Sequence, residues 1–347
     1  MSAVLEVLDP GFFVTLQDGG RKGFRNIGVP LAGALDPVWL AAANALAGNP
    51  VDAPGLEVRL AGPTLRLKEG GPVRLALVGA MTGEVTTAEG AKRPVAANAA
   101  VTLKPGDTFK AGRATGTAYI AVSGGFLGDA DLGSYSTFER ARLGGIKGRA
   151  PQRGDLIACR ALAASAGGDL CAEAPPAHAR GPIRIMLGPQ DDHFEPETLQ
   201  AFCRDTYTVS PSLDRMGMRL EGPVLTHNAL GADIVSDGVT PGVIQCPANG
   251  QPIILLADGQ TTGGYAKIAC AIRADLPRLA HLRPGDTLHF AAVTRDEAKA
   301  ARQAAQAVFT QWVCTLAPVR PEGPPDSVML LSHNLISGVT AGEDESV

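Results

Sequence analysis

Short apolar runs recur along the chain, and each is bounded by Gly, Pro or Asp. The clearest are residues 73–80, 117–126, 182–189 and 252–259. Continuous or alternating apolar positions over so few residues are typical of buried strands. Because such runs dominate and helical periodicity is scarce, the pattern predicts a mainly β protein with a few helices.

Two segments have a helical pattern with recognisable ends. Residues 35–49 offer Asp36 as an N-cap, a proline at the first helical position, and Gly48 just past the last apolar residue. Residues 294–313 open with a Thr-x-x-Glu capping box. We therefore expect one helix near the N-terminus and a longer one near the C-terminus.

Two pairs of phrases repeat in the same order about half a chain apart. The phrase RLAGPTL at 59–65 is echoed by RLEGPVL at 219–225, and LKPGDT at 103–108 is echoed by LRPGDT at 282–287. The repeats suggest duplicated β domains, although Pro-Gly-Asp before a strand is also a common turn.

A stretch rich in small residues marks the expected domain boundary. Residues 162–181 are dominated by Ala and Gly and contain a Pro-Pro pair, which is typical of a linker or a long surface excursion. We predict an N-terminal β domain with linker over 1–178, a C-terminal β domain over 179–293, and a helix and tail over 294–347.

The composition fits a globular protein of the reduced cytoplasm. Hydrophobic residues make up 45%, charged residues 19%, and the net charge of −4 gives no hint of nucleic-acid or membrane partners. No apolar run approaches the ~18 residues that span a bilayer, and the first residues lack the features of a signal peptide. The six cysteines form no Cys-x-x-Cys pair.

Standard catalytic patterns are absent. The chain has no G-x-x-x-x-G-K-[ST] phosphate loop, no G-x-S-x-G elbow and no H-E-x-x-H pair. The six histidines are isolated in the sequence, and only His193 stands beside acidic residues. A metal site at His193 is one interpretation, but a polar turn is favoured, and we predict no metal.

Three dense polar phrases remain, at 15–36, 210–222 and 254–269. Turns with surface ion pairs would explain any one of them, but turns alone rarely need Gln, Arg, Tyr and Lys together. The candidate residues carry amide, carboxylate, hydroxyl or cationic groups, or are glycines that let the backbone approach a ligand. For binding they are Gln17, Asp18, Arg21, Arg215, Gln245, Gln260, Thr261, Thr262, Gly263 and Gly264; for catalysis, Asp258, Tyr265 and Lys267.

This inventory of side chains suits a small amide. Gln offers a donor and an acceptor to an amide edge, and Arg binds a carboxylate with two parallel hydrogen bonds. Asp can accept a proton, while Lys can stabilise an oxyanion. We expect an amide or ureide ligand, with the first and third phrases, and hence Asp18 and Asp258, converging on one cleft.

Long phrases of the chain resemble the allophanate hydrolase subunit 2 family. They are QDGGRKGFRNIGVPLAGALD, DRMGMRLEGP and GVIQCPANGQPIILLADGQTTGGYAKIACAIRADLPRLAHLRPGD. That family includes the C subunit of the prokaryotic 5-oxoprolinase, the Kip-inhibitor antagonist and the carboxyltransferase domain of urea carboxylase. The resemblance runs nearly from end to end and implies two cyclophilin-like β-barrel domains.

The resemblance also implies a function. The leading expectation is the C subunit of an ATP-dependent 5-oxoprolinase, which opens 5-oxo-L-proline to L-glutamate together with an A subunit and a Kip-inhibitor-like B subunit. ATP would then be bound by, or shared with, a partner. The runner-up is a carboxyltransferase that moves CO2 from carboxybiotin, supplied by a partner, to urea or a related amide. A non-catalytic antagonist of a kinase inhibitor is the third possibility.

The Asp-x-Gln-Thr-Thr-Gly-Gly-Tyr segment at 258–265 matches one of the family's strongest motifs. We expect this loop to line the ligand pocket. Asp258 or Tyr265 would then manage a proton, and Lys267 or Arg215 would face the negative group of the ligand.

Overall fold

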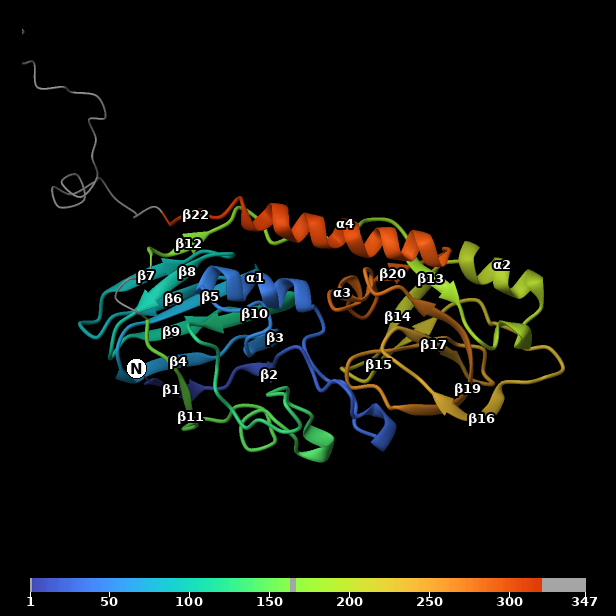
Figure 1. Cartoon of the computed structure of the whole chain (residues 1–347), viewed down its shortest axis with the longest axis horizontal. Helices are drawn as coiled ribbons and strands as arrows, with labels where there is room; N and C mark the ends of the chain where they lie inside the picture. The colour runs from blue at the N-terminus through green and yellow to red at the C-terminus, as the bar shows by residue number, and fades with distance from the viewer. Residues whose placement is uncertain (1, 163–166, 320–347) are drawn as a thin grey trace, which may run out of the picture.

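The computed structural model describes residues 2–162 and 167–319. It consists of two β-rich lobes side by side, with one long helix lying along both of them (Figure 1). The prediction of a mainly β protein with a few helices is confirmed. The predicted tail after residue 319 lies outside the described residues.

The N-terminal lobe contains two sheets, and alternating residues of their strands meet in one core. The strand order is β11-β1-β4-β9-β6-β7 in one sheet and β2-β3-β10-β5-β8 in the other. The strands are β1 (Ser2–Asp9), β2 (Phe12–Gln17), β3 (Gly55–Ala61), β4 (Thr64–Gly70), β5 (Val73–Ala80), β6 (Gly83–Thr86), β7 (Lys92–Val95), β8 (Ala100–Leu103), β9 (Thr108–Ala111), β10 (Thr115–Val122) and β11 (Leu156–Arg160).

Strand β5 explains why its apolar run is continuous rather than alternating. Leu75 and Leu77 face the core between the two sheets. Ala76 and Val78 face the other way and pack with residues of the first helix, including Leu40. Because both faces of the strand are covered, the strand needs no polar residues at alternate positions.

The C-terminal lobe is built on one nearly closed, barrel-like sheet. The order is β20-β14-β15-β18-β17-β19-β13-β21, with β16 also paired to β19. The strands are β13 (Ile183–Leu187), β14 (Tyr207–Leu213), β15 (Gly217–Glu221), β16 (Asp233–Gly238), β17 (Val243–Cys246), β18 (Ile253–Leu255), β19 (Thr262–Ala271), β20 (Thr287–Leu288) and β21 (Phe290–Ala292). A separate pair, β12 (Leu170–Cys171) and β22 (Ala317–Pro318), lies beside the N-terminal lobe.

The two predicted helices, α1 and α4, begin at their predicted caps. The helices are α1 (Pro37–Ala47), α2 (Pro196–Arg204), α3 (Leu276–Leu279) and α4 (Arg295–Val313), with 3-10 turns η1 (Arg25–Ile27), η2 (Glu139–Ala141) and η3 (Asp191–His193). Asp36 accepts hydrogen bonds from the first turn of α1, and α4 starts with its Thr-x-x-Glu capping box. Trp312 of α4 packs into the α1 cluster, so the C-terminal helix returns to the N-terminal lobe (Figure 1). None of the helices in the described ranges is long and apolar enough to cross a bilayer.

The repeated Pro-Gly-Asp phrases form the same turn in the two lobes. Gly106 N–H donates to the Leu67 carbonyl at 2.8 Å, and Gly285 N–H donates to the Val209 carbonyl at 2.9 Å. Both glycines have a φ of +92°. The acceptor Leu67 comes after the RLAGPTL phrase, whereas the acceptor Val209 comes before the RLEGPVL phrase. The N-terminal lobe also has two sheets, whereas the C-terminal lobe is built on one. Shared turn chemistry explains this repeat; the duplication and the domain limits stay predictions.

Candidate functional site

Arg215 joins the two lobes through a buried ion-pair triad. Its guanidinium binds both carboxylate oxygens of Asp258 at 2.9 Å and the Glu57 carboxylate of β3 at 2.5 Å. It also donates to the Gly33 carbonyl at 2.7 Å. Glu57 is anchored in turn by the Tyr119 hydroxyl at 2.7 Å. We call Glu57, Arg215 and Asp258 the triad; all three residues are paired.

The triad shifts the pKa values of Arg215 and Asp258. Burial lowers the pKa of Arg215, but the carboxylates of Glu57 and Asp258 outweigh it and hold that pKa above its usual value. Burial raises the pKa of Asp258 above its usual value, although Arg215 opposes the shift. The raised pKa makes the Asp258 carboxylate a better proton acceptor than an ordinary aspartate.

The end of β2 places Gln17 and Asp18 against the loop that follows residue 133. The Asp18 carboxylate accepts hydrogen bonds from the Ser134 and Ser136 hydroxyls, both at 2.6 Å, and from the Tyr135 N–H at 2.7 Å. Gln17 donates its amide to the Thr137 carbonyl at 3.3 Å, while its own carbonyl oxygen Oε1 is buried without a partner. Asp18 therefore holds the loop, and Gln17 keeps one free acceptor.

Two arginines of the first phrase, the buried Arg21 and the half-buried Arg25, each have a buried nitrogen without a partner. Arg21 donates Nη2 to the Ser136 carbonyl at 2.5 Å, but its Nε and Nη1 have no partner. Arg25, on η1, donates Nη2 to the carbonyls of Val239 and Gln260, and its Nη1 is unpaired. Burial lowers the pKa of each; for Arg21 the carboxylates of Asp18, Asp131 and Asp258 oppose the shift.

Gln245 on β17 carries a further unpaired donor. Its Oε1 accepts from the Gln260 amide at 3.2 Å, while its Nε2 is buried without a partner. That Nε2 sits where a side chain at Gly263 would be, because a Cβ there would lie 2.4 Å from it. Arg25 reaches the same loop through the Gln260 carbonyl. We call Arg25, Gln245 and Gln260 the donor cluster.

The remaining candidates of the third phrase surround the donor cluster. Lys267 stands opposite Gln245 in the β17–β19 register, and its buried ammonium pairs with the exposed carboxylate of Asp237. The Thr261 carbonyl accepts from the Val239 N–H at 3.0 Å. Thr262 and Gly264 lie in β19, and Thr262 is exposed. Tyr265 is 42% exposed, and no hydrogen bond among the described residues joins it to Asp258.

The first and third phrases touch directly. Ala32 N–H donates to the Ala257 carbonyl at 3.0 Å, and Arg25 contacts the Gln260 carbonyl. Asp18 itself points to the 134–136 loop. One open pocket of about 490 Å³ is lined by Gln190, His193 and Asp237, which places it beside the Lys267 ion pair rather than beside Asp18 or Asp258. The predicted common cleft of Asp18 and Asp258 therefore stays a prediction.

A family model supplies the first comparison. The model described as carboxyltransferase domain, subdomain A and B, matches residues 27–292. The chain belongs to this carboxyltransferase-domain family. The matched range contains the triad, Gln245 and Gln260, and it begins two residues after Arg25.

Relatives of this carboxyltransferase-domain chain match it almost throughout. It is 36% identical to the 5-oxoprolinase C subunit of Escherichia coli over 89% of this chain and 97% of the relative. It is 35% identical to the 5-oxoprolinase C subunit of Haemophilus influenzae over 86% and 94%. The solved structure of K. lactis urea amidolyase is similar with a TM-score of 0.77 and 27% identity, over 89% of this chain and 20% of that one.

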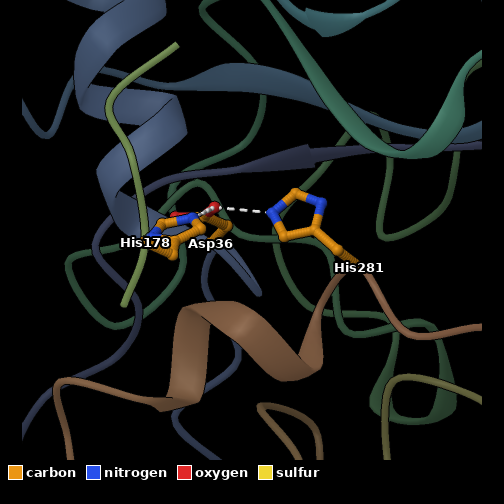
Figure 2. A group of neighbouring side chains, drawn as sticks. All are labelled: Asp36, His178 and His281. Carbon is orange, nitrogen blue, oxygen red and sulfur yellow. Dashed lines mark hydrogen bonds and ion pairs between the residues drawn. The ribbon is translucent and has the colours of Figure 1, made fainter. Parts of the chain in front are cut away.

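Sequence reasoning missed another polar centre in this family member, formed by Asp36 and two histidines. Asp36 accepts hydrogen bonds from His178 at 2.6 Å and His281 at 2.8 Å (Figure 2). The fold therefore brings together two histidines that are isolated in the sequence. Their sequence separations carry no spacing signal, and Asp36 already had a role as a helix cap. His193, by contrast, binds the Gly231 carbonyl at 2.7 Å, as a polar turn would.

Proposed function

We propose that this chain is the C subunit of an ATP-dependent 5-oxoprolinase, which converts 5-oxo-L-proline to L-glutamate. The two bacterial 5-oxoprolinase C subunits, matched over nearly their whole length, support the proposal. The chain would act with an A subunit and a Kip-inhibitor-like B subunit. ATP would be bound by, or shared with, a partner, because this chain has no G-x-x-x-x-G-K-[ST] loop.

The observation that carries the proposal is a surplus of buried, unpaired polar atoms in the first phrase and in the strand that precedes the third phrase. Arg21, Arg25 and Gln245 all have nitrogens without a partner, while Gln17 has an unpaired carbonyl oxygen. An unpaired buried polar atom costs about 1–3 kcal/mol, so a ligand that pairs with such atoms gains affinity. A lactam that bears a carboxylate offers the required acceptors, and its N–H suits the Gln17 oxygen.

The reaction assigns separate tasks to the side chains. The lactam C–N bond breaks as one water supplies a hydroxyl to the carbonyl carbon and a proton to the nitrogen. A second water is consumed as ATP is converted to ADP and phosphate. Asp258 would accept a proton, since burial raises its pKa towards the useful range. Lys267 and the donor cluster would stabilise negative charge on the oxygen, and Tyr265 would position the substrate.

A carboxyltransferase acting on urea or a related amide is the second candidate. It is favoured by the description of the matching family model and by the similarity to K. lactis urea amidolyase. Urea and 5-oxoproline share an amide edge, so the same donors would bind either one. Carboxybiotin, delivered by a partner, would supply the carboxyl group in that case.

Co-expression with the neighbouring genes tests the proposal. We expect the assembled complex to release glutamate from 5-oxoproline only with ATP, and the purified chain alone to be inert. Sustained glutamate release by the chain alone would overturn the division of labour. Carboxylation of urea by the complex, with no glutamate release, would favour the second candidate instead.

A further inference from the structure

Asp36 lies where three distant parts of the chain meet. It precedes α1 in the N-terminal lobe, while His178 comes from the segment between the lobes and His281 follows α3 in the C-terminal lobe (Figure 2). The Asp36 side chain is fully buried, and the two imidazoles are mostly so. Neither the triad nor the donor cluster includes any of these residues.

The two oxygens of Asp36 have different partners. Oδ1 accepts hydrogen bonds from the Val38 and Trp39 N–H groups at 2.9 and 3.0 Å, which caps α1 and fixes the carboxylate. Oδ2 is left to the imidazoles, and Nε2 of each histidine points at it. The backbone of Asp36 is held as well, because its N–H donates to the Tyr119 hydroxyl at 2.8 Å.

We propose that Asp36, His178 and His281 bind a divalent transition-metal ion, with Zn²⁺ as the reference case. Their ligand atoms all lie within 4.8 Å of one another, in the described part of the chain. Two imidazoles and one carboxylate form a donor set that such metals prefer, with ligands at about 2.0–2.2 Å. Tetrahedral binding needs ligand atoms about 3.3 Å apart, so each imidazole would retreat by roughly half an ångström.

The surroundings supply what a metal site needs beyond its ligands. The α1 N–H groups and Tyr119 orient Asp36, as outer partners do in known sites.

An open position would face a pocket of about 370 Å³ beside the imidazoles. Trp39 forms one wall, with ring centres 4.1 Å from His281 and 5.7 Å from His178. Arg278 and Arg283 line the same pocket, and Arg278 is already paired with Asp275 at 3.2 Å. The geometry suits a metal with an open site for a small anion, such as a carboxylate or phosphate.

The competing explanation is a purely structural hydrogen-bond network that ties the three segments together. Glutamine separates the two explanations, because its amide N–H can still donate to Asp36 while it is a poor ligand for Zn²⁺. His178→Gln, His281→Gln and the double variant are therefore the informative changes. His289→Ala is the matched control, because His289 is exposed and belongs to no group of potential ligands among the described residues.

The experiment titrates the full-length chain with Zn²⁺ after chelator treatment, by calorimetry, and repeats it with Co²⁺ by visible absorption. We expect about one equivalent of metal to bind to the wild-type chain and to His289→Ala with the same affinity. In each Gln variant the affinity should fall about 10- to 100-fold. Thermal melting without metal should stay close to wild type in those variants. Absence of Zn²⁺ and Co²⁺ binding to the wild-type chain, or unchanged affinity in the double variant, would overturn the proposal. Neither readout depends on 5-oxoprolinase activity.

Discussion

The triad and the donor cluster are two polar centres that each contain an arginine but differ in how completely their polar groups are paired. In the triad, Arg215 makes hydrogen bonds with Asp258, Glu57 and the Gly33 carbonyl, and the N-terminal lobe supplies two of these partners. In the donor cluster, Arg25 and Gln245 keep buried nitrogens without partners. Buried polar groups are normally paired, so we infer that the triad is a junction that stabilises the fold, and we propose the donor cluster as the ligand site.

The two centres are adjacent rather than independent. The negative charge of Asp258 opposes the lowering of the Arg21 pKa by burial. Arg21 lies four residues before Arg25 in the same loop. Arg215 fixes Gly33 at the end of that loop through a 2.7 Å hydrogen bond. The triad thus holds the end of the loop that carries Arg25 of the donor cluster, as a rigid support does for a binding site.

Arg215→Met should cause the largest change in stability. The substitution leaves the Glu57 and Asp258 carboxylates buried beside each other, which costs about 3–5 kcal/mol of unfolding free energy. Chemical denaturation of the purified chain measures it. Arg219→Met, an exposed change on the same hairpin, is the control and should unfold like the wild type. Equal stability of the two variants would mean that the triad does not support the fold.

Asp258→Asn should reduce turnover of the assembled complex by about 100-fold, which is the scale of general acid–base catalysis. The near-isosteric change leaves the Arg215–Glu57 pair in place, so we expect the fold to survive with a loss of about 1–3 kcal/mol. Turnover and melting temperature are measured on the same preparation. Full activity would remove Asp258 from the chemistry and leave it as a purely structural member of the triad.

Gly263→Ala should impair the donor cluster without disturbing the fold. The new Cβ would lie 2.4 Å from Gln245 Nε2, so the amide has to swing away. Because that atom ends a flexible side chain, we expect stability to be nearly unchanged and KM for 5-oxoproline to rise about 3- to 10-fold. Gly264→Ala is the matched control, since the nearest atoms to its Cβ are 3.6 Å away. Equal KM values in the two variants would count against the site.

Tyr265→Phe should have the smallest effect. The side chain is 42% exposed and belongs to neither centre, so its hydroxyl is expected to position substrate only. We predict a change in kcat/KM of less than about 3-fold in the complex. A loss comparable to that of Asp258→Asn would instead assign proton transfer to the tyrosine.

Local patterns were sufficient for the elements but not for their long-range partners. The apolar run at 73–80 begins and ends at the same residues as β5. The caps of α1 and α4 depend on residues only three or four positions apart in the sequence. The short helices α2 and α3 have too few turns for a period to emerge.

The candidate site was predictable by residue type rather than by contact. The polar phrases supplied Arg215, Gln245 and Asp258, because turns rarely concentrate such side chains. Glu57 was missed because it occupies an ordinary strand position, GLEVRLA, and its meeting with Arg215 spans 158 residues. The Asp36 centre was missed for the same physical reason, since folding alone brings its members together.

The most direct test of the central claim is the KM of Gln245→Met for 5-oxoproline in the assembled complex. Methionine keeps the length of the side chain and removes the unpaired Nε2 donor, while Gln152→Met makes the same change at an exposed position. We predict that KM rises about 10-fold in Gln245→Met, corresponding to about 1.4 kcal/mol, with kcat and melting temperature close to wild type. A KM equal to that of Gln152→Met would contradict the assignment of the donor cluster as the substrate site.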